Sequence, residues 1–211
     1  MLSFPGRVGR NGGLALLFLA ALALGSAVPA FAHPHVFIAD RLTVSFDKGM
    51  LRGVSFEWTF DPMFSAMILG DYDPGHMGTF DAQRAAALKQ GAFDNLVNYH
   101  YFIAIWVGGK PLRKLLIQGF TPTVAEKERL VYRFFVPLDV PVIAEEQTVL
   151  LTVYDDSYYV AFDVLKIADV TVQAGPDVVC GLSIQKTRVK PQWPGQYMPD
   201  QLVIRFKEPA P

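Results

Sequence analysis

The chain has only one cysteine, no excess of basic residues and no apolar stretch long enough to span a bilayer. A lone Cys180 excludes an intramolecular disulfide, and we expect it to be a small buried apolar residue rather than a reactive thiol. Nineteen lysines and arginines stand against 20 acidic residues, which gives a formal net charge of −1. Because no basic stripe could neutralise phosphates, neither nucleic acid nor an anionic membrane is an expected partner.

The sequence also lacks the short motifs that carry common enzyme chemistry. It contains no nucleophile elbow, no glycine-rich phosphate loop, no paired-cysteine zinc motif and no His-Glu-x-x-His helix. No internal repeat, low-complexity run or linker marks a second domain, and the length favours a single domain. These absences favour a non-enzymatic protein with one folded domain.

The first 32 residues have the order of a cleaved secretory signal. Arg7 and Arg10 precede an apolar run from Leu14 to Leu24, and Ala30-Phe-Ala32 supplies small residues at the two positions that a signal peptidase reads. The apolar run is shorter than the ~20 residues that a membrane span needs. We therefore expect an exported, periplasmic protein with no membrane anchor after cleavage. It would comprise residues 33–211 with 17 basic and 20 acidic residues, a net charge of −3.

Cleavage after Ala32 would create an amino terminus rich in nitrogen donors. The mature chain would begin His33-Pro34-His35. Pro34 has no amide proton to lose, so the square-planar mode that uses two deprotonated amides is blocked. The His33 amine and imidazole remain, and His35 lies ~6.6 Å away on the same side of a strand. Such donors suit nickel, cobalt, copper or zinc; the alternative is a pair of solvated histidines.

Alternating hydrophobicity predicts a hairpin at the start of the mature chain. Apolar residues share one parity over 36–46 and again over 54–60, with Asp47-Lys48-Gly49 as the turn. Further short strands separated by turn signals are expected at residues 101–107, 112–120, 130–136, 148–154, 158–165 and 170–173. The pattern predicts a mainly β (α+β) fold, an antiparallel β-sandwich over residues 33–190. Residues 191–211 are expected to form a proline-rich tail with an edge strand at 202–206.

Residues 62–100 lack the alternating pattern of the strands and contain helix-forming residues. They predict a helical insertion that carries an EF-hand-like loop. Asp73, Gly78 and Asp81 occupy the first, sixth and ninth positions of a calcium loop. Gly75 and Met77 stand where side-chain oxygens belong at the third and fifth positions. Arg84 replaces the glutamate of position twelve. The loop is therefore degenerate, and the sequence argues against calcium.

Three other side chains could extend a transition-metal site. Glu57 and Asp61 lie on the polar parity of the second strand of the hairpin, beside the strand that follows His33 and His35. Either could ligate an ion or orient an imidazole, although an ordinary solvated sheet face is the competing interpretation. His76 in the Asp-rich loop could add a nitrogen, or it could be a solvated loop histidine.

Several motifs together resemble a known family. They are His33-Pro-His-Val-Phe-Ile, Glu57-Trp-Thr-Phe-Asp-Pro-Met-Phe-Ser-Ala, the Asp-rich loop, Tyr99-His-Tyr-Phe and Tyr154-Asp-Asp-Ser-Tyr-Tyr. Over residues 33–185 the chain resembles a domain-of-unknown-function family of exported bacterial proteins, labelled the periplasmic component of an uncharacterised ABC-type transport system. The resemblance implies a gene beside a nickel/cobalt-type membrane exporter and a role in periplasmic metal handling. Many members have a loop closer to a true calcium loop, a property that Gly75, Met77 and Arg84 do not support here.

Three functional hypotheses follow. The first is a periplasmic accessory protein that binds a transition metal through His33 and His35 and buffers the ion or passes it to a membrane transporter. The second is a β-sandwich interaction module of a membrane transport complex, in which the histidines are incidental. The third is a copper-dependent oxidative enzyme built on the amino-terminal histidine, which no other sequence feature favours.

Overall fold

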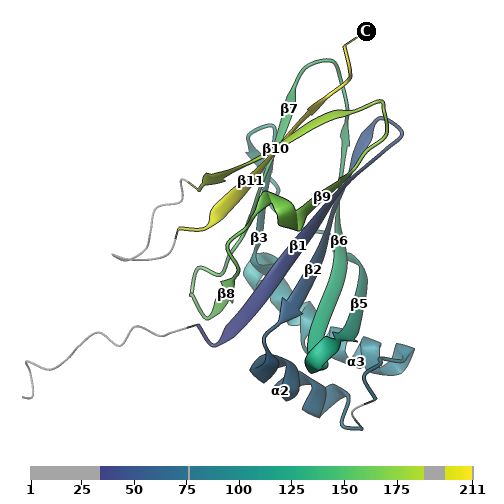
Figure 1. Cartoon of the computed structure of the whole chain (residues 1–211), viewed down its shortest axis with the longest axis vertical. Helices are drawn as coiled ribbons and strands as arrows, with labels where there is room; N and C mark the ends of the chain where they lie inside the picture. The colour runs from purple at the N-terminus through teal and green to yellow at the C-terminus, as the bar shows by residue number, and fades with distance from the viewer. Residues whose placement is uncertain (1–33, 76, 188–197, 211) are drawn as a thin grey trace, which may run out of the picture. The chain divides into compact units, whose positions relative to one another are not determined.

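The computed structural model of the chain (Figure 1) describes residues 34–75, 77–187 and 198–210, all within the unit His33–Pro211. The cleavage site expected after Ala32, residues 191–197 of the proline-rich tail and Pro211 lie outside these ranges. Two sheets and a helical segment make up the described part. The expected mainly β fold, a sandwich with a helical insertion, is confirmed.

The first sheet, sheet A, is built around the predicted hairpin. Its strand order is β5-β6-β2-β1-β8, and β9 also pairs with β1. The hairpin register pairs Ile38 with Phe60 and Val44 with Val54. The strands of sheet A are β1 (Val36–Asp47), β2 (Met50–Phe60), β5 (Gln118–Ala125), β6 (Arg129–Pro141), β8 (Val160–Phe162) and β9 (Val170–Gln173).

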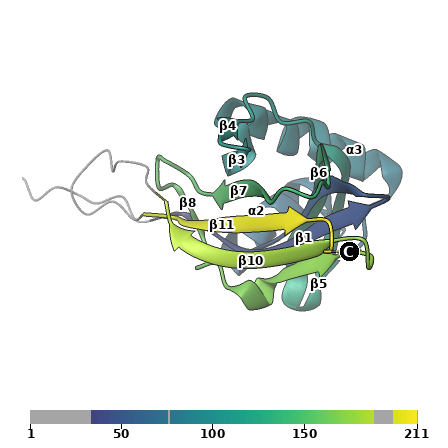
Figure 2. The same ribbon diagram turned by 90° about the horizontal axis from the view of Figure 1, so that it is seen from above.

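The second sheet, sheet B, has the order β10-β11-β7-β3-β4, and Figure 2 shows these strands following one another in that sequence. All its neighbouring strands are antiparallel. The strands are β3 (Ile103–Val107), β4 (Lys110–Pro111), β7 (Gln147–Val153), β10 (Val179–Lys186) and β11 (Asp200–Lys207).

One apolar core lies between the two sheets. The apolar parity of β1 and β2 that the sequence shows is the buried parity, and Val44, Val54 and Trp58 have no exposed surface. Phe46 of β1 meets Phe206 of β11 edge to face, with ring centroids 5.3 Å apart. Burial of apolar surface on both sheets is therefore the main stabilising contribution to the sandwich.

The helical insertion consists of α2 (Pro62–Tyr72), α3 (Ala82–Gly91) and the 3₁₀ segment η1 (Phe93–Phe102). Figure 1 shows α2 and α3 at the end of sheet A where β2 runs into α2. The buried Ser65 hydroxyl joins α2 to the sheet, because it donates to Phe60 O and accepts from Leu130 N–H at 3.0 Å. Among the described residues, no helix has the length and apolarity that crossing a membrane requires.

Four details differ from the sequence expectations. The strand predicted at 202–206 is not at an edge: β11 pairs with β10 on one side and β7 on the other. The strand predicted at 112–120 begins only at Gln118, and β10 was not expected at all. The sandwich is also not wholly antiparallel, because β8 and β9 run parallel to β1. Such non-local pairings leave no mark in local hydrophobic periodicity.

Asp40 is an acidic residue on the core-facing parity of β1. It lies opposite Trp58 in the hairpin register, and Asp40 Oδ1 and Trp58 Nε1 are both buried; an interaction with Trp58 opposes the rise in the Asp40 pKa described below but is outweighed. On its other edge, β1 pairs with β8 up to Ile38 and with β9 from Leu42. Residues 39–41 between these pairings therefore have no strand partner there. Burial, reinforced by the nearby charge of Asp169, raises the pKa of Asp40 to about 8.

Stability should consequently fall as the pH rises from about 4 to about 8, because folded Asp40 retains a proton that the unfolded chain has already lost. We expect Asp40→Asn to remove most of this slope and to stabilise the protein at pH 8 by a few kcal/mol. Urea denaturation at several pH values measures the effect. The solvent-exposed Asp163→Asn serves as the control and should keep the wild-type slope. An unchanged slope in Asp40→Asn would contradict the expectation.

Candidate functional site

His35 lies immediately before β1, at the exposed point where the described chain begins. Its backbone N–H donates to Tyr159 O at 2.9 Å, and its imidazole packs against the Tyr159 ring with centroids 4.9 Å apart. The side chain of His35 remains exposed, on the outward parity of β1 that the sequence predicts. His35 is thus held by its backbone hydrogen bond and by the contact of one ring face with Tyr159. The rest of the imidazole is open to solvent.

The Tyr154–Tyr159 segment, which precedes β8 and supports His35, is held by Asp155. The buried Asp155 carboxylate accepts the N–H of Ser157 and of Val160, each at 2.9 Å, and the Ser157 hydroxyl at 2.7 Å. These contacts are typical of an Asp that shapes a turn. Asp155 therefore acts on the site indirectly, by fixing the turn that contacts His35.

Asp61 lies close to His35 in the fold, but both of its carboxylate oxygens are engaged. One accepts Phe64 N–H at 2.9 Å and caps α2; the other accepts Phe37 N–H at 2.8 Å. Asp61 N–H also donates to Phe37 O at 2.9 Å. Asp61 therefore joins the beginning of α2 to the beginning of β1.

Glu57 lies on the same outer face of sheet A, but much further along it. It is opposite Arg41 in the hairpin register and forms a 2.7 Å ion pair with Arg133 of β6. Six residues of strand separate position 41 from position 35, a distance of about 20 Å. Because of this separation, we leave Glu57 out of the metal site proposed below.

His33 and His76 lie outside the described residues. Within the described ranges, no group of three or more His, Cys, Asp or Glu side chains is arranged to hold a metal ion. Of the two histidines expected at the processed amino terminus, only His35 lies within the described residues. The metal site stays a prediction.

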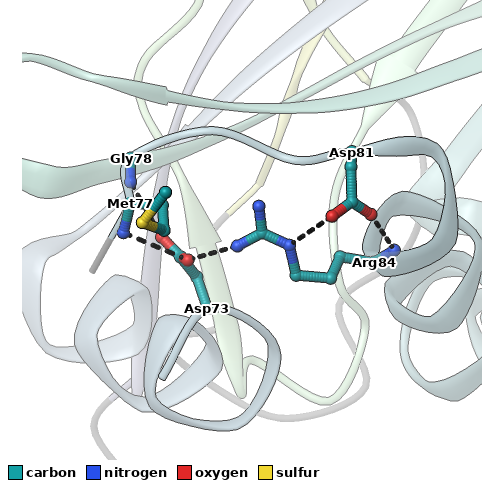
Figure 3. A network of polar contacts seen from close by, with 5 residues as sticks. All are labelled: Asp73, Met77, Gly78, Asp81 and Arg84. Atoms are coloured by element: carbon teal, nitrogen blue, oxygen red, sulfur yellow. Dashed lines mark hydrogen bonds and ion pairs between the residues drawn. The ribbon is translucent and has the colours of Figure 1, made fainter. Parts of the chain in front are cut away.

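The Asp-rich loop encloses an arginine between its two acidic residues (Figure 3). Asp73, at the end of α2, is buried and accepts the N–H groups of Met77 and Gly78 at 3.2 and 2.9 Å. The Arg84 guanidinium contacts the Asp73 carboxylate through Nη1 and that of Asp81 through Nε. Burial acts to raise the pKa of Asp73, but these N–H groups and Arg84 outweigh it, so the pKa lies below its ordinary value. The loop thus supplies its own cation.

Residues 17–201 match a family described as "Protein of unknown function (DUF1007)". The chain belongs to this family. The DUF1007 match confirms that the resemblance is to a domain family of unknown function.

Two similar proteins carry equally general names. An "Uncharacterized protein" of Haemophilus influenzae is 32% identical over 143 residues, which cover 62% of each chain. An "Uncharacterized 15.5 kDa protein in trpE 3'region" of Spirochaeta aurantia is 35% identical over 89 residues, covering 42% of this chain and 62% of that protein. The chain therefore matches less than two thirds of the length of either relative.

Replacing Arg84 should destabilise the loop more than removing a comparable surface arginine. Arg84→Gln would leave Asp73, whose side chain is only 2% exposed, without its cation. The matched control is Arg52→Gln, because Arg52 pairs with Asp139, a side chain that is 62% exposed. We expect the melting temperature to fall by several degrees for Arg84→Gln and hardly at all for Arg52→Gln. Equal shifts would show that the Arg84 contacts do not order the loop.

Proposed function

We propose that the protein is exported to the periplasm and binds a transition-metal ion through its processed amino terminus, as an accessory protein of a metal transport system. The donors would be the α-amine and imidazole of His33 together with the imidazole of His35. The ion would be nickel, cobalt, copper or zinc, in keeping with nitrogen donors. The protein would buffer this ion or pass it to a membrane transporter or exporter.

The observation that carries this proposal is the fixed, exposed imidazole of His35. Its backbone hydrogen bond to Tyr159 O and its ring contact with Tyr159 reduce the freedom that metal binding would otherwise remove. The Asp61 carboxylate accepts the N–H of Phe37, and the Asp61 N–H donates to Phe37 O, so that the adjacent part of β1 is held in place. Only Pro34 stands between His35 and position 33, and its ring restricts the backbone further. A short, stiff connection of this kind favours joint binding by the two histidines.

A second candidate is an interaction module of a membrane transport complex, with no role for the histidines. Several apolar side chains in the elements around His35 are exposed, including Phe37 at 51%, Met63 at 70% and Tyr159 at 57%. Exposed apolar side chains that cluster are typical of protein contact surfaces. The two candidates differ in whether the free amine of His33 matters.

Calorimetric titration with copper(II), nickel(II) and zinc(II) salts distinguishes them. The protein is purified after export, and mass spectrometry establishes that it begins at His33. We expect one ion to bind per chain. Placing one alanine before His33 should weaken binding at least tenfold, because the amine is then no longer next to the imidazole. His35→Ala should also weaken it, whereas His100→Asn, at an exposed histidine elsewhere, should not.

Equal binding by the protein with and without the added alanine would contradict the proposal and favour the interaction module. The same conclusion would follow if the exported protein began at any residue other than His33. Binding lost equally in His35→Ala and His100→Asn would indicate unspecific association with surface histidines.

A further inference from the structure

Three consecutive non-glycine residues at the junction of η1 and β3 have left-handed backbone conformations. His100, Tyr101 and Phe102 have φ values of 49°, 51° and 55°. Side chains with a Cβ disfavour this region, and such residues cluster at ligand sites, where the surrounding structure maintains the strain. The junction is held in place by Tyr154 N–H, which donates to Phe102 O at 2.8 Å.

This junction forms one wall of a cavity of about 770 Å³. Ala104 and Trp106 of β3 line it from the outward-facing parity of the strand, and Leu112 and Arg113 line it after β4. A volume of this size is in the range of small-molecule sites, roughly 300–1,000 Å³.

Aromatic side chains form part of the cavity wall. Tyr99, Trp106 and Tyr154 line it, and Tyr99 is 59% exposed. Tyr99 stacks on Phe102 with ring centroids 5.7 Å apart, and Phe102 in turn contacts Trp58 and Phe162 of sheet A. The aromatic wall is therefore continuous with the core, and a planar ring could stack on it without reorganising the core.

The charged side chains that line the cavity indicate which polar group a bound aromatic ligand would carry. Arg113 lines it, is exposed, and has no ion pair or hydrogen bond with another described residue. Asp156 also lines it and already interacts within the chain. A guanidinium presents a planar set of N–H donors that matches a carboxylate. Arg113 therefore offers an unengaged guanidinium to a ligand, beside the negative charge of Asp156 at the same cavity.

We propose that this cavity is a binding site for a small planar aromatic carboxylate. The ring would stack among Tyr99, Trp106 and Tyr154, and the carboxylate would accept hydrogen bonds from Arg113. The site does not involve His33 or His35, so it stands or falls independently of the metal proposal. The left-handed residues His100–Phe102 would set the position of Tyr99 against the ring.

Three naphthalene probes of the same shape test the charge preference. The full chain, in the form that the cell processes, is titrated by calorimetry with 2-naphthoate, 2-naphthylmethanol and 2-naphthylmethylamine. We expect 2-naphthoate to bind at least tenfold more tightly than the other two. Amide resonances of residues 99–106 should shift on binding. Absence of binding at millimolar 2-naphthoate, or tighter binding of the amine, would overturn the proposal.

Two variants and a control locate the site. Ala104→Trp should fill the cavity and abolish 2-naphthoate binding, whereas Val179→Trp, on β10 at the far edge of sheet B, should leave it unchanged. Arg113→Gln should weaken 2-naphthoate about tenfold and leave 2-naphthylmethanol unaffected. Because Arg113 is exposed, this variant is expected to fold even if Ala104→Trp does not. Unchanged 2-naphthoate affinity in Arg113→Gln would contradict the role given to the guanidinium.

Discussion

Strand β1 is hydrogen-bonded along both of its edges, and the remaining elements depend on that pairing. It pairs with β2 on one side and with β8 and β9 on the other. Its inward side chains fill the core, while its outward side chains form the polar face of sheet A. The first described residues lead directly into this central strand. Residues 34 and 35 therefore lead into a strand that is paired on both of its edges.

The Tyr154–Tyr159 turn connects two regions that are far apart in the sequence. Its carbonyl at Tyr159 accepts from His35, and its N–H at Tyr154 donates to Phe102. Asp155 holds the turn through three side-chain hydrogen bonds. The amino-terminal segment and the strained junction before β3 consequently share one support.

Local patterns in the sequence were sufficient for the hairpin, the sandwich class and the helical insertion, because each depends on periodicity or turn residues. They could not indicate which strands are neighbours, so β11 appeared to be an edge strand and β10 was missed. The core-facing parity of β1 does contain one sequence signal of an unusual buried group, because Asp40 interrupts a series of apolar residues. The cavity beside β3 could not be predicted either, since residues 98–113 and 154–156 meet only through tertiary pairing.

The two acidic residues of the Asp-rich loop, Asp73 and Asp81, are paired with the cationic side chain of Arg84. Because the Arg84 guanidinium is attached to α3, it cannot diffuse away, and its ion pairs with Asp73 and Asp81 do not depend on an ion taken up from solution.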